Sequence, residues 1–198
     1  MSEAGLAATI RSKKPRPAHV SKAQSRSQIL DAARRVAVRD GARELSLRAV
    51  AAEAGFAPAG LYGYFRGKDE LLLALAADDL THLARAMREA GSLNGASAAA
   101  LALLGGTETI AAASQALPRE GGGSDAERLF NGRMIAALRA LSDVSGLPSD
   151  NRQNQCDVVL VAAALAGLAL LERSGRLGAL GFKPAEILAR LESRFAKP

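Results

Sequence analysis

Several residue types are scarce in this sequence of 198 residues, and their scarcity excludes whole classes of protein. A single cysteine, Cys156, excludes a disulfide within the chain, and two histidines beside one thiol leave no ligand spacing typical of a zinc site. The sequence also lacks a glycine-rich phosphate loop, a dinucleotide-binding fingerprint and a visible Ser-His-Asp arrangement. We therefore expect a protein without cofactor or metal that is not an enzyme.

Strand patterns and long apolar segments are missing as well. Alternation of polar and β-branched residues extends nowhere beyond a few positions, which predicts an all-α protein. The longest strongly apolar run, Val158 to Leu171, has 14 residues and is shorter than the roughly 20 that cross a bilayer. The N-terminus has no apolar segment typical of a secretory signal. We interpret the run as a buried helix and expect a cytoplasmic protein with no membrane span.

Positive charge is present and unevenly distributed. The formal net charge is +6 and the sequence pI is about 10.0. Residues 1–70 hold 13 Lys and Arg against 7 Asp and Glu, whereas residues 71–198 hold 13 of each. This distribution indicates a nucleic-acid partner for the first third of the chain. Residues 1–24, with Pro15 and Pro17, are expected to form a basic disordered arm, either a solvated tail or a segment that contacts DNA.

Capping residues and glycines divide the remaining sequence into helices. Ser46 is a suitable N-cap, Pro58 suits a first helical turn, and Gly41 and Gly55 are placed to end helices, the former in a left-handed cap. The predicted helices cover residues 25–40, 46–54, 58–66, 68–90, 96–117 with a break near 105–106, 125–144, 150–174 and 184–196.

Residues 46–65 have the pattern of a helix-turn-helix, which is two short helices joined at a glycine-containing turn. Small alanines before Gly55 let the two helices approach closely, and Phe56 can fill the angle between them. Four of the seven aromatic residues, from five Phe and two Tyr, fall between positions 56 and 65. The second helix would then be free to enter the major groove of DNA.

The wider pattern resembles a known family. It consists of Ile29-Leu-Asp-Ala-Ala33, Gly41, Ser46-Leu-Arg-Ala-Val-Ala51, Ala54-Gly-Phe56, Leu61-Tyr-Gly-Tyr-Phe65 and Lys68-Asp-Glu-Leu71. Over about residues 25–75 this is similar to the N-terminal domain of the tetracycline-repressor (TetR/AcrR) family of bacterial regulators. The resemblance implies a helix-turn-helix DNA-binding domain at residues 25–67, followed by a larger helical ligand-binding and dimerisation domain at residues 68–198.

The resemblance also implies which residues contact DNA. It places Ser46, Tyr62 and Lys68 against backbone phosphates, and Arg48 against a phosphate or a base edge. Because several of the other positions carry no polar side chain, we expect sparse base readout that depends on Arg48, on Tyr64, on thymine-methyl contacts from alanines and on DNA shape. The remaining residues that we assign to this interface are Leu47, Ala57, Pro58, Ala59, Gly63 and Tyr64.

For the C-terminal part the resemblance implies an effector cavity and a dimer interface formed by the last two helices. The dimer face is expected at the small residues of the apolar run, Ala162, Ala166, Gly167 and Ala169. An ordinary core position is the alternative for each apolar cavity candidate, and an ordinary half-exposed histidine is the alternative for His82. The cavity candidates are His82, Leu101, Leu104, Ile110, Leu117, Phe130, Met134 and Leu138.

Together these features predict a ligand-responsive transcriptional regulator. In this hypothesis a homodimeric repressor binds a pseudo-palindromic double-stranded DNA operator and is released by a small apolar or amphipathic effector. One alternative is a nonspecific DNA-compacting protein, favoured by the basic arm and the apolar recognition positions. An enzyme built on residues 71–198 is a weaker alternative, since no catalytic residue can be named for it.

Overall fold

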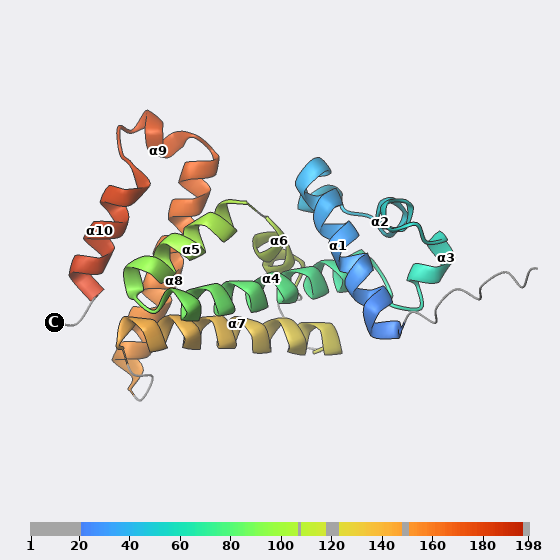
Figure 1. Ribbon diagram of the computed structural model, residues 1–198, viewed down its shortest axis with the longest axis horizontal. Coiled ribbons are helices and arrows are strands. Elements are labelled where there is room, and N and C mark those ends of the chain that lie inside the picture. Colours follow the sequence, from blue (N-terminus) through green and yellow to red (C-terminus); the bar gives the residue numbers. More distant parts are fainter. Residues whose placement is uncertain (1–20, 107, 118–122, 148–150, 196–198) are drawn as a thin grey trace, which may run out of the picture.

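The computed structural model describes residues 21–106, 108–117, 123–147 and 151–195, and this part of the chain is all-α, as the sequence predicts (Figure 1). The helical elements are α1 (Lys22–Asp40), η1 (Ala42–Glu44), α2 (Leu47–Ala54), α3 (Pro58–Leu61), α4 (Lys68–Ala90), α5 (Leu93–Gly105), α6 (Thr109–Ala116), α7 (Asp125–Ser145), α8 (Arg152–Arg173), α9 (Arg176–Ala179) and α10 (Pro184–Phe195).

Helix α1 begins earlier than the sequence pattern predicts. Ser21 is its N-cap and forms a capping box with Gln24, each side chain accepting a hydrogen bond from the other residue's backbone N–H. The last residues assigned to the basic arm are therefore helical, and residues 1–20 lie outside the described part of the chain. Gly41 ends α1 with φ 94° and ψ 145°, which is not the left-handed helical cap we expected, because the chain turns directly into η1.

Helices α1 to α3 pack around a small apolar core and form a unit that we call the reading head, residues 22–67. The fully buried side chains at its centre include Ile29, Val36, Val50, Leu61 and Phe65. Arg26 lies over the ring of Phe65, with its guanidinium carbon 5.2 Å from the ring centroid. Since α2 and α3 are too short to be stable alone, this core positions them.

An ion-pair cluster holds α1 against α2. Glu53 of α2 accepts a hydrogen bond from Arg35 Nε at 2.7 Å and one from Arg39 Nη1 at 3.1 Å. The hydrogen bonds from Arg35 and then Arg39 hold the pKa of the Glu53 carboxyl below its ordinary value. Such a carboxylate stabilises the fold above its unfolded-state pKa, and the contribution disappears as the pH falls through the lower folded-state pKa.

We expect Glu53→Gln to lower the Tm slightly at pH 7, because Arg35 and Arg39 both lose the Glu53 carboxylate and Arg39 keeps only its pairing with Asp40. The difference from the unmodified protein should shrink as the pH falls from the unfolded-state pKa, about 4.3, through the lower folded-state pKa, below which Glu53 is protonated in both states. Thermal melts followed by circular dichroism between pH 2.5 and 7 measure this. Glu44→Gln is the control, because Glu44 makes no ion pair within the described residues. A Tm difference independent of pH would contradict the assignment.

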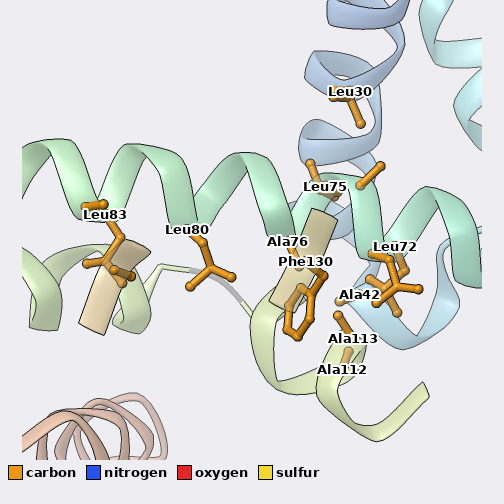
Figure 2. Packing of buried hydrophobic residues seen from close by; sticks show 14 of the residues in the cluster. Leu30, Ala42, Leu72, Leu75, Ala76, Leu80, Leu83, Ala112, Ala113 and Phe130 are labelled. Atoms are coloured by element: carbon orange, nitrogen blue, oxygen red, sulfur yellow. The ribbon is translucent and has the colours of Figure 1, made fainter. Parts of the chain in front are cut away.

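Helix α4 is the long element that connects the reading head to the rest of the molecule. It begins at Lys68 and ends at Ala90 with Gly91 as its C-cap, as the sequence predicts, and α7 runs along it (Figure 1). Helices α5 and α6 contact the same helix, and α8 packs against α5 and α7. Phe130 of α7 is 2% exposed and lies among buried side chains from α4, α6 and η1 (Figure 2).

Helix α8 contains the apolar run that we interpreted as a buried helix, and only one side of it is buried. Val158, Val161, Leu165 and Leu168 pack inside the chain. The opposite side is exposed, and we call it the α8 face: Val159, Leu160, Ala163, Gly167, Leu170 and Leu171. By length and composition α8 is also apolar enough to cross a membrane, and 28% of its apolar stretch is buried within the protein. Within a single chain the run is therefore buried on one side only.

Candidate DNA-binding surface and effector cavities

The turn between α2 and α3 has the geometry that the sequence predicts. Ser46 is the N-cap of α2, and its Oγ accepts a hydrogen bond from Ala49 N at 3.2 Å. Gly55 ends α2 in the left-handed conformation, with φ 71° and ψ 26°, which a residue with a Cβ adopts only with strain. Phe56 N then bonds to Ala51 O at 2.9 Å, and Pro58 opens α3. The capped hydroxyl of Ser46 keeps its own hydrogen free to donate to a phosphate.

The residues on the outer side of this turn are exposed. Tyr62 is 63% exposed, and Arg48 is exposed and makes no ion pair within the described residues. The other exposed positions that the sequence assigned to this surface are Ser46, Ala57, Pro58, Ala59, Gly63 and Lys68. A free guanidinium and a free phenol on one convex surface are suited to phosphate and base contacts.

Leu47, Tyr64 and Lys68 differ from their predicted roles in the free protein. Leu47 is only 8% exposed and belongs to the reading-head core, so its assignment to the DNA interface is wrong. Tyr64 is half-buried, with its ring edge-on to Phe56 at a centroid distance of 6.4 Å. The Lys68 ammonium donates a hydrogen bond to the carbonyl of Arg43, which joins the start of α4 to η1. A phosphate contact was expected for Lys68, and this tertiary contact to Arg43 had no signal in the sequence.

Helix α3 has a single turn and is shorter than predicted, since Gly60 and Gly63 favour the unfolded chain. Neither glycine has a positive φ, and a Cβ added at Gly60 would meet no atom within 4 Å. At Gly63 the added Cβ would lie 3.4 Å from the carbonyl oxygen of Gly60. The fold of the free head therefore does not require glycine at Gly60, and the bare backbone leaves room for a close partner.

A small apolar cavity, the inner cavity, lies between α4, α5, α6, α7 and α8. Its volume is about 130 Å³, and it brings together four of the predicted residues, Leu104, Ile110, Met134 and Leu138. Its other lining residues were not predicted individually: Leu80, Leu83, Met87, Ala100, Ala137, Leu141, Ala162, Leu165 and Ala166. A ligand in this cavity would meet almost only carbon atoms.

Several predicted cavity and dimer residues lie elsewhere. Leu101 is buried, Leu117 is half-buried, and Phe130 fills the core between α4 and α7, and none of the three lines the inner cavity or the larger cavity beside the reading head. Ala169 is 3% exposed inside its own chain and has almost no surface to offer a partner. Ala162 and Ala166 line the inner cavity, and of the predicted dimer residues Ala166 and Gly167 are exposed on the surface of α8.

A larger cavity lies where the reading head meets α4, α5 and α6, and we call it the junction cavity. Its volume is about 420 Å³, and His82 lies in its wall. Leu83, Leu104 and Ile110 line both this cavity and the inner cavity, so the two spaces are adjacent. Its other lining residues are Arg34, Val38, Asp79, Ala102, Leu103 and Gly106.

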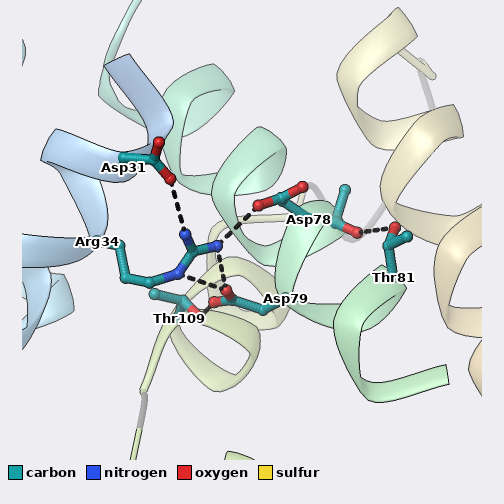
Figure 3. A network of polar contacts seen from close by, with 7 residues as sticks. Asp31, Arg34, Asp78, Asp79, Thr81 and Thr109 are labelled. Carbon is teal, nitrogen blue, oxygen red and sulfur yellow. Dashed lines mark hydrogen bonds and ion pairs between the residues drawn. The ribbon is translucent and has the colours of Figure 1, made fainter. Parts of the chain in front are cut away.

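One arginine connects the reading head to α4 at this cavity (Figure 3). Arg34 of α1 donates from Nε and Nη2 to Asp79 at 3.2 and 2.8 Å, from Nη2 to Asp78 at 2.8 Å, and from Nη1 to Asp31 at 3.4 Å. Thr109 of α6 donates a hydrogen bond to the second oxygen of Asp79. Burial lowers the pKa of Arg34, but its hydrogen bonds to Asp78 and Asp79 outweigh burial and raise the pKa above its ordinary value.

The geometry defines a class of protein. A capped short helix, a left-handed glycine turn and an exposed second helix form a helix-turn-helix, and the excess positive charge of the chain lies in this third of the sequence. The class is that of helix-turn-helix DNA-binding proteins with a separate helical module.

Comparisons with known proteins narrow this class to one family. Residues 29–75 match the sequence model of the family described as bacterial regulatory proteins, tetR family. A stretch of 68 residues is 43% identical to the HTH-type nicotine-responsive transcriptional repressor HdnoR of Paenarthrobacter nicotinovorans. That match covers 34% of this chain and spans about a third, 35%, of the length of the repressor. Over residues 29–75 the chain therefore matches the tetR family, in agreement with the resemblance seen in the sequence.

Solved structures share the fold over nearly the whole chain. A TetR transcriptional regulator from Rhodococcus sp. RHA1 has a TM-score of 0.60 at 16% identity, covering 85% of this chain and 94% of that one. BioQ, in a structure with its natural double-stranded DNA operator, has a TM-score of 0.56 at 22% identity, covering 86% of this chain and 97% of that one. At these identities the likeness concerns the fold.

Proposed function

We propose that this protein is a cytoplasmic repressor that binds a pseudo-palindromic operator as a homodimer and is released by a small-molecule effector. The observation that carries the proposal is the exposed group Ser46, Arg48 and Tyr62 on the helix-turn-helix of the reading head. HdnoR, which is similar over 68 residues, is by its name a nicotine-responsive transcriptional repressor. BioQ, which has a similar fold, was solved with its DNA operator. Both likenesses support the proposal.

The α8 face supports the homodimer. Six apolar or small residues on consecutive turns of α8 are exposed, with Leu160 and Leu170 each 57% exposed. A contiguous apolar surface of this kind is typical of a subunit interface. The surface continues into a groove of about 660 Å³ between α7 and α8, which Val159, Leu160 and Ile135 line. A twofold dimer formed through this face would present two reading heads to successive major grooves.

The two cavities support the effector. The inner cavity is apolar and the junction cavity is within the size range of small-molecule sites, and both are lined by α4, the helix that continues from the reading head. An effector can weaken or strengthen DNA binding only if it binds one arrangement of the two reading heads more tightly than the other. We propose that the effector favours the arrangement that does not fit the operator, so that its binding releases the protein from DNA.

We expect Arg48→Ala to weaken operator binding about 5- to 150-fold, the range for loss of one direct arginine contact to a base or a comparable charged contact. The measurement is fluorescence anisotropy with a duplex that the protein itself has selected from a random-sequence library, and with a scrambled duplex. If Arg48 contacts a phosphate, the slope of log affinity against log salt should fall by about 1; if it reads a base, discrimination against the scrambled duplex should fall instead.

Tyr62→Phe removes only a hydroxyl. It should lower the affinity for both the selected and the scrambled duplex about 2- to 10-fold without changing the slope of log affinity against log salt. Arg88→Ala is the matched control for Arg48, because Arg88 is exposed on the last turn of α4, away from the head. Unchanged affinity in both variants would refute the DNA-contact assignment. Equal affinity of the unmodified protein for selected and scrambled duplexes would favour the nonspecific DNA-compacting protein.

A further inference from the structure

The junction cavity combines an apolar wall with an acidic end. Leu83, Leu103 and Ile110 supply carbon surface, and Asp79 supplies a carboxylate whose side chain is 11% exposed. We propose that this cavity binds an organic cation with an apolar body, and that the ammonium group of this ligand pairs with Asp79. The inference rests on the proposed function, because it specifies the chemistry of a small-molecule effector.

The local charge favours a cation over an anion. Asp31, Asp78 and Asp79 share the single guanidinium of Arg34 at 2.8 to 3.4 Å, which leaves two negative charges in excess around this end of the cavity. Of the three carboxylates only Asp79 lines the cavity itself, and Asp31 and Asp78 lie behind Arg34 with side chains 59% and 36% exposed. The groups that face Asp79 from neighbouring elements are Arg34 of α1 and the neutral hydroxyl of Thr109 on α6. An anion would be repelled by the surplus carboxylates, and a neutral ligand would gain no charge pairing.

The size and lining of the cavity favour an organic ligand over a metal ion. A volume of about 420 Å³ is within the range of small-molecule sites, whereas a metal ion needs several converging ligands. Among the described residues no group of three His, Cys, Asp or Glu side chains is placed to hold a metal ion. The apolar walls would bury a hydrocarbon body while the charged group stays at Asp79.

Binding of a cation here would act on the contact between α1 and α4. Asp79 Oδ1 accepts both hydrogen bonds that Arg34 donates to this residue, so a ligand ammonium competes with the guanidinium for the same oxygen. Removing Arg34 should therefore strengthen binding of a cation, whereas it would abolish binding of an anion. This difference in sign separates the two chemistries.

The test uses three probes with one body: 4-phenylbutylamine, 4-phenylbutan-1-ol and 4-phenylbutyrate, titrated into the full chain by isothermal calorimetry without DNA. We expect the amine to bind at least about tenfold tighter than the alcohol and the carboxylate. Asp79→Asn should remove this preference, and Arg34→Met should raise the affinity for the amine several-fold. Asp143→Asn and Arg88→Met, at exposed positions, are the controls and should leave the affinities for all three probes unchanged.

A second pair of variants keeps the test decisive if Asp79→Asn or Arg34→Met unfolds in a thermal melt. Leu103 lines the cavity and Leu129 lies on α7, and each is 39% exposed. Leu103→Lys should weaken amine binding at least fivefold by charge repulsion, and Leu129→Lys should leave it unchanged. An amine that binds no tighter than the alcohol, or a preference that survives Asp79→Asn, overturns the inference. Because no DNA is present, loss of operator binding in a separate assay refutes only the proposed function.

Discussion

Leu160→Lys should convert the protein to a monomer and weaken operator binding by about 100-fold or more. Leu160 lies on the α8 face and is 57% exposed, so a lysine is accommodated in the isolated subunit. In a twofold dimer the new charge appears on both subunits and is buried in an apolar interface, which is strongly unfavourable. A monomer loses the gain from binding two half-sites at once, which is typically 10²- to 10⁴-fold.

Sedimentation velocity in detergent-free buffer and anisotropy with the selected duplex measure the two effects. Leu129→Lys is the control, since it adds the same charge at an exposed leucine outside the α8 face. A Leu160→Lys protein that remains a dimer would place the interface elsewhere. If instead the unmodified protein sediments with membranes and needs detergent, the α8 face is covered by lipid and the dimer proposal fails.

Phe130→Ala should destabilise the protein by about 3–5 kcal/mol, the usual cost of removing a buried aromatic ring. Phe130 is 2% exposed and fills the space between α4, α6 and α7 (Figure 2), where small alanine side chains on α4 and α6 cannot close the resulting hole. Urea unfolding followed by circular dichroism gives the free energy of unfolding.

Leu129→Ala, one residue earlier and 39% exposed, is the comparison and should cost less than about 1 kcal/mol. If Phe130 contacted the effector, as the sequence led us to expect, its replacement would reduce the effector response while leaving stability nearly unchanged. A loss below about 1 kcal/mol for Phe130→Ala would therefore contradict the core position.

The helix boundaries of the reading head were largely predictable because their signals are local. Ser46 and Gly55 act within three or four residues, through a capping hydrogen bond and a left-handed turn, and both occur where the sequence places them. The start of α1 was missed although Ser21 and Gln24 have capping-box spacing, because the basic composition up to residue 24 indicated a disordered arm.

The C-terminal site was less predictable because its residues meet across long sequence separations. Arg34 and Asp79 are 45 positions apart, and no local pattern pairs them. The adjacent acids Asp78 and Asp79 interrupt the apolar stripe of α4, and this interruption could have indicated a positively charged partner on a neighbouring helix. The run in α8 showed how apolar the helix is, but composition cannot tell a side buried within the chain from one that a second subunit would cover.

The empty space around Gly60 has a consequence for how this regulator could change over evolutionary time. A side chain added there meets no neighbour in the free protein, so substitutions should carry little folding penalty while adding a chemical group to the exposed helix that we propose enters the major groove. At this position the stability of the fold and the DNA sequence that the protein would recognise can therefore change independently. A duplicated copy of the gene could acquire a different target sequence by a single codon change and keep its stability and its effector intact.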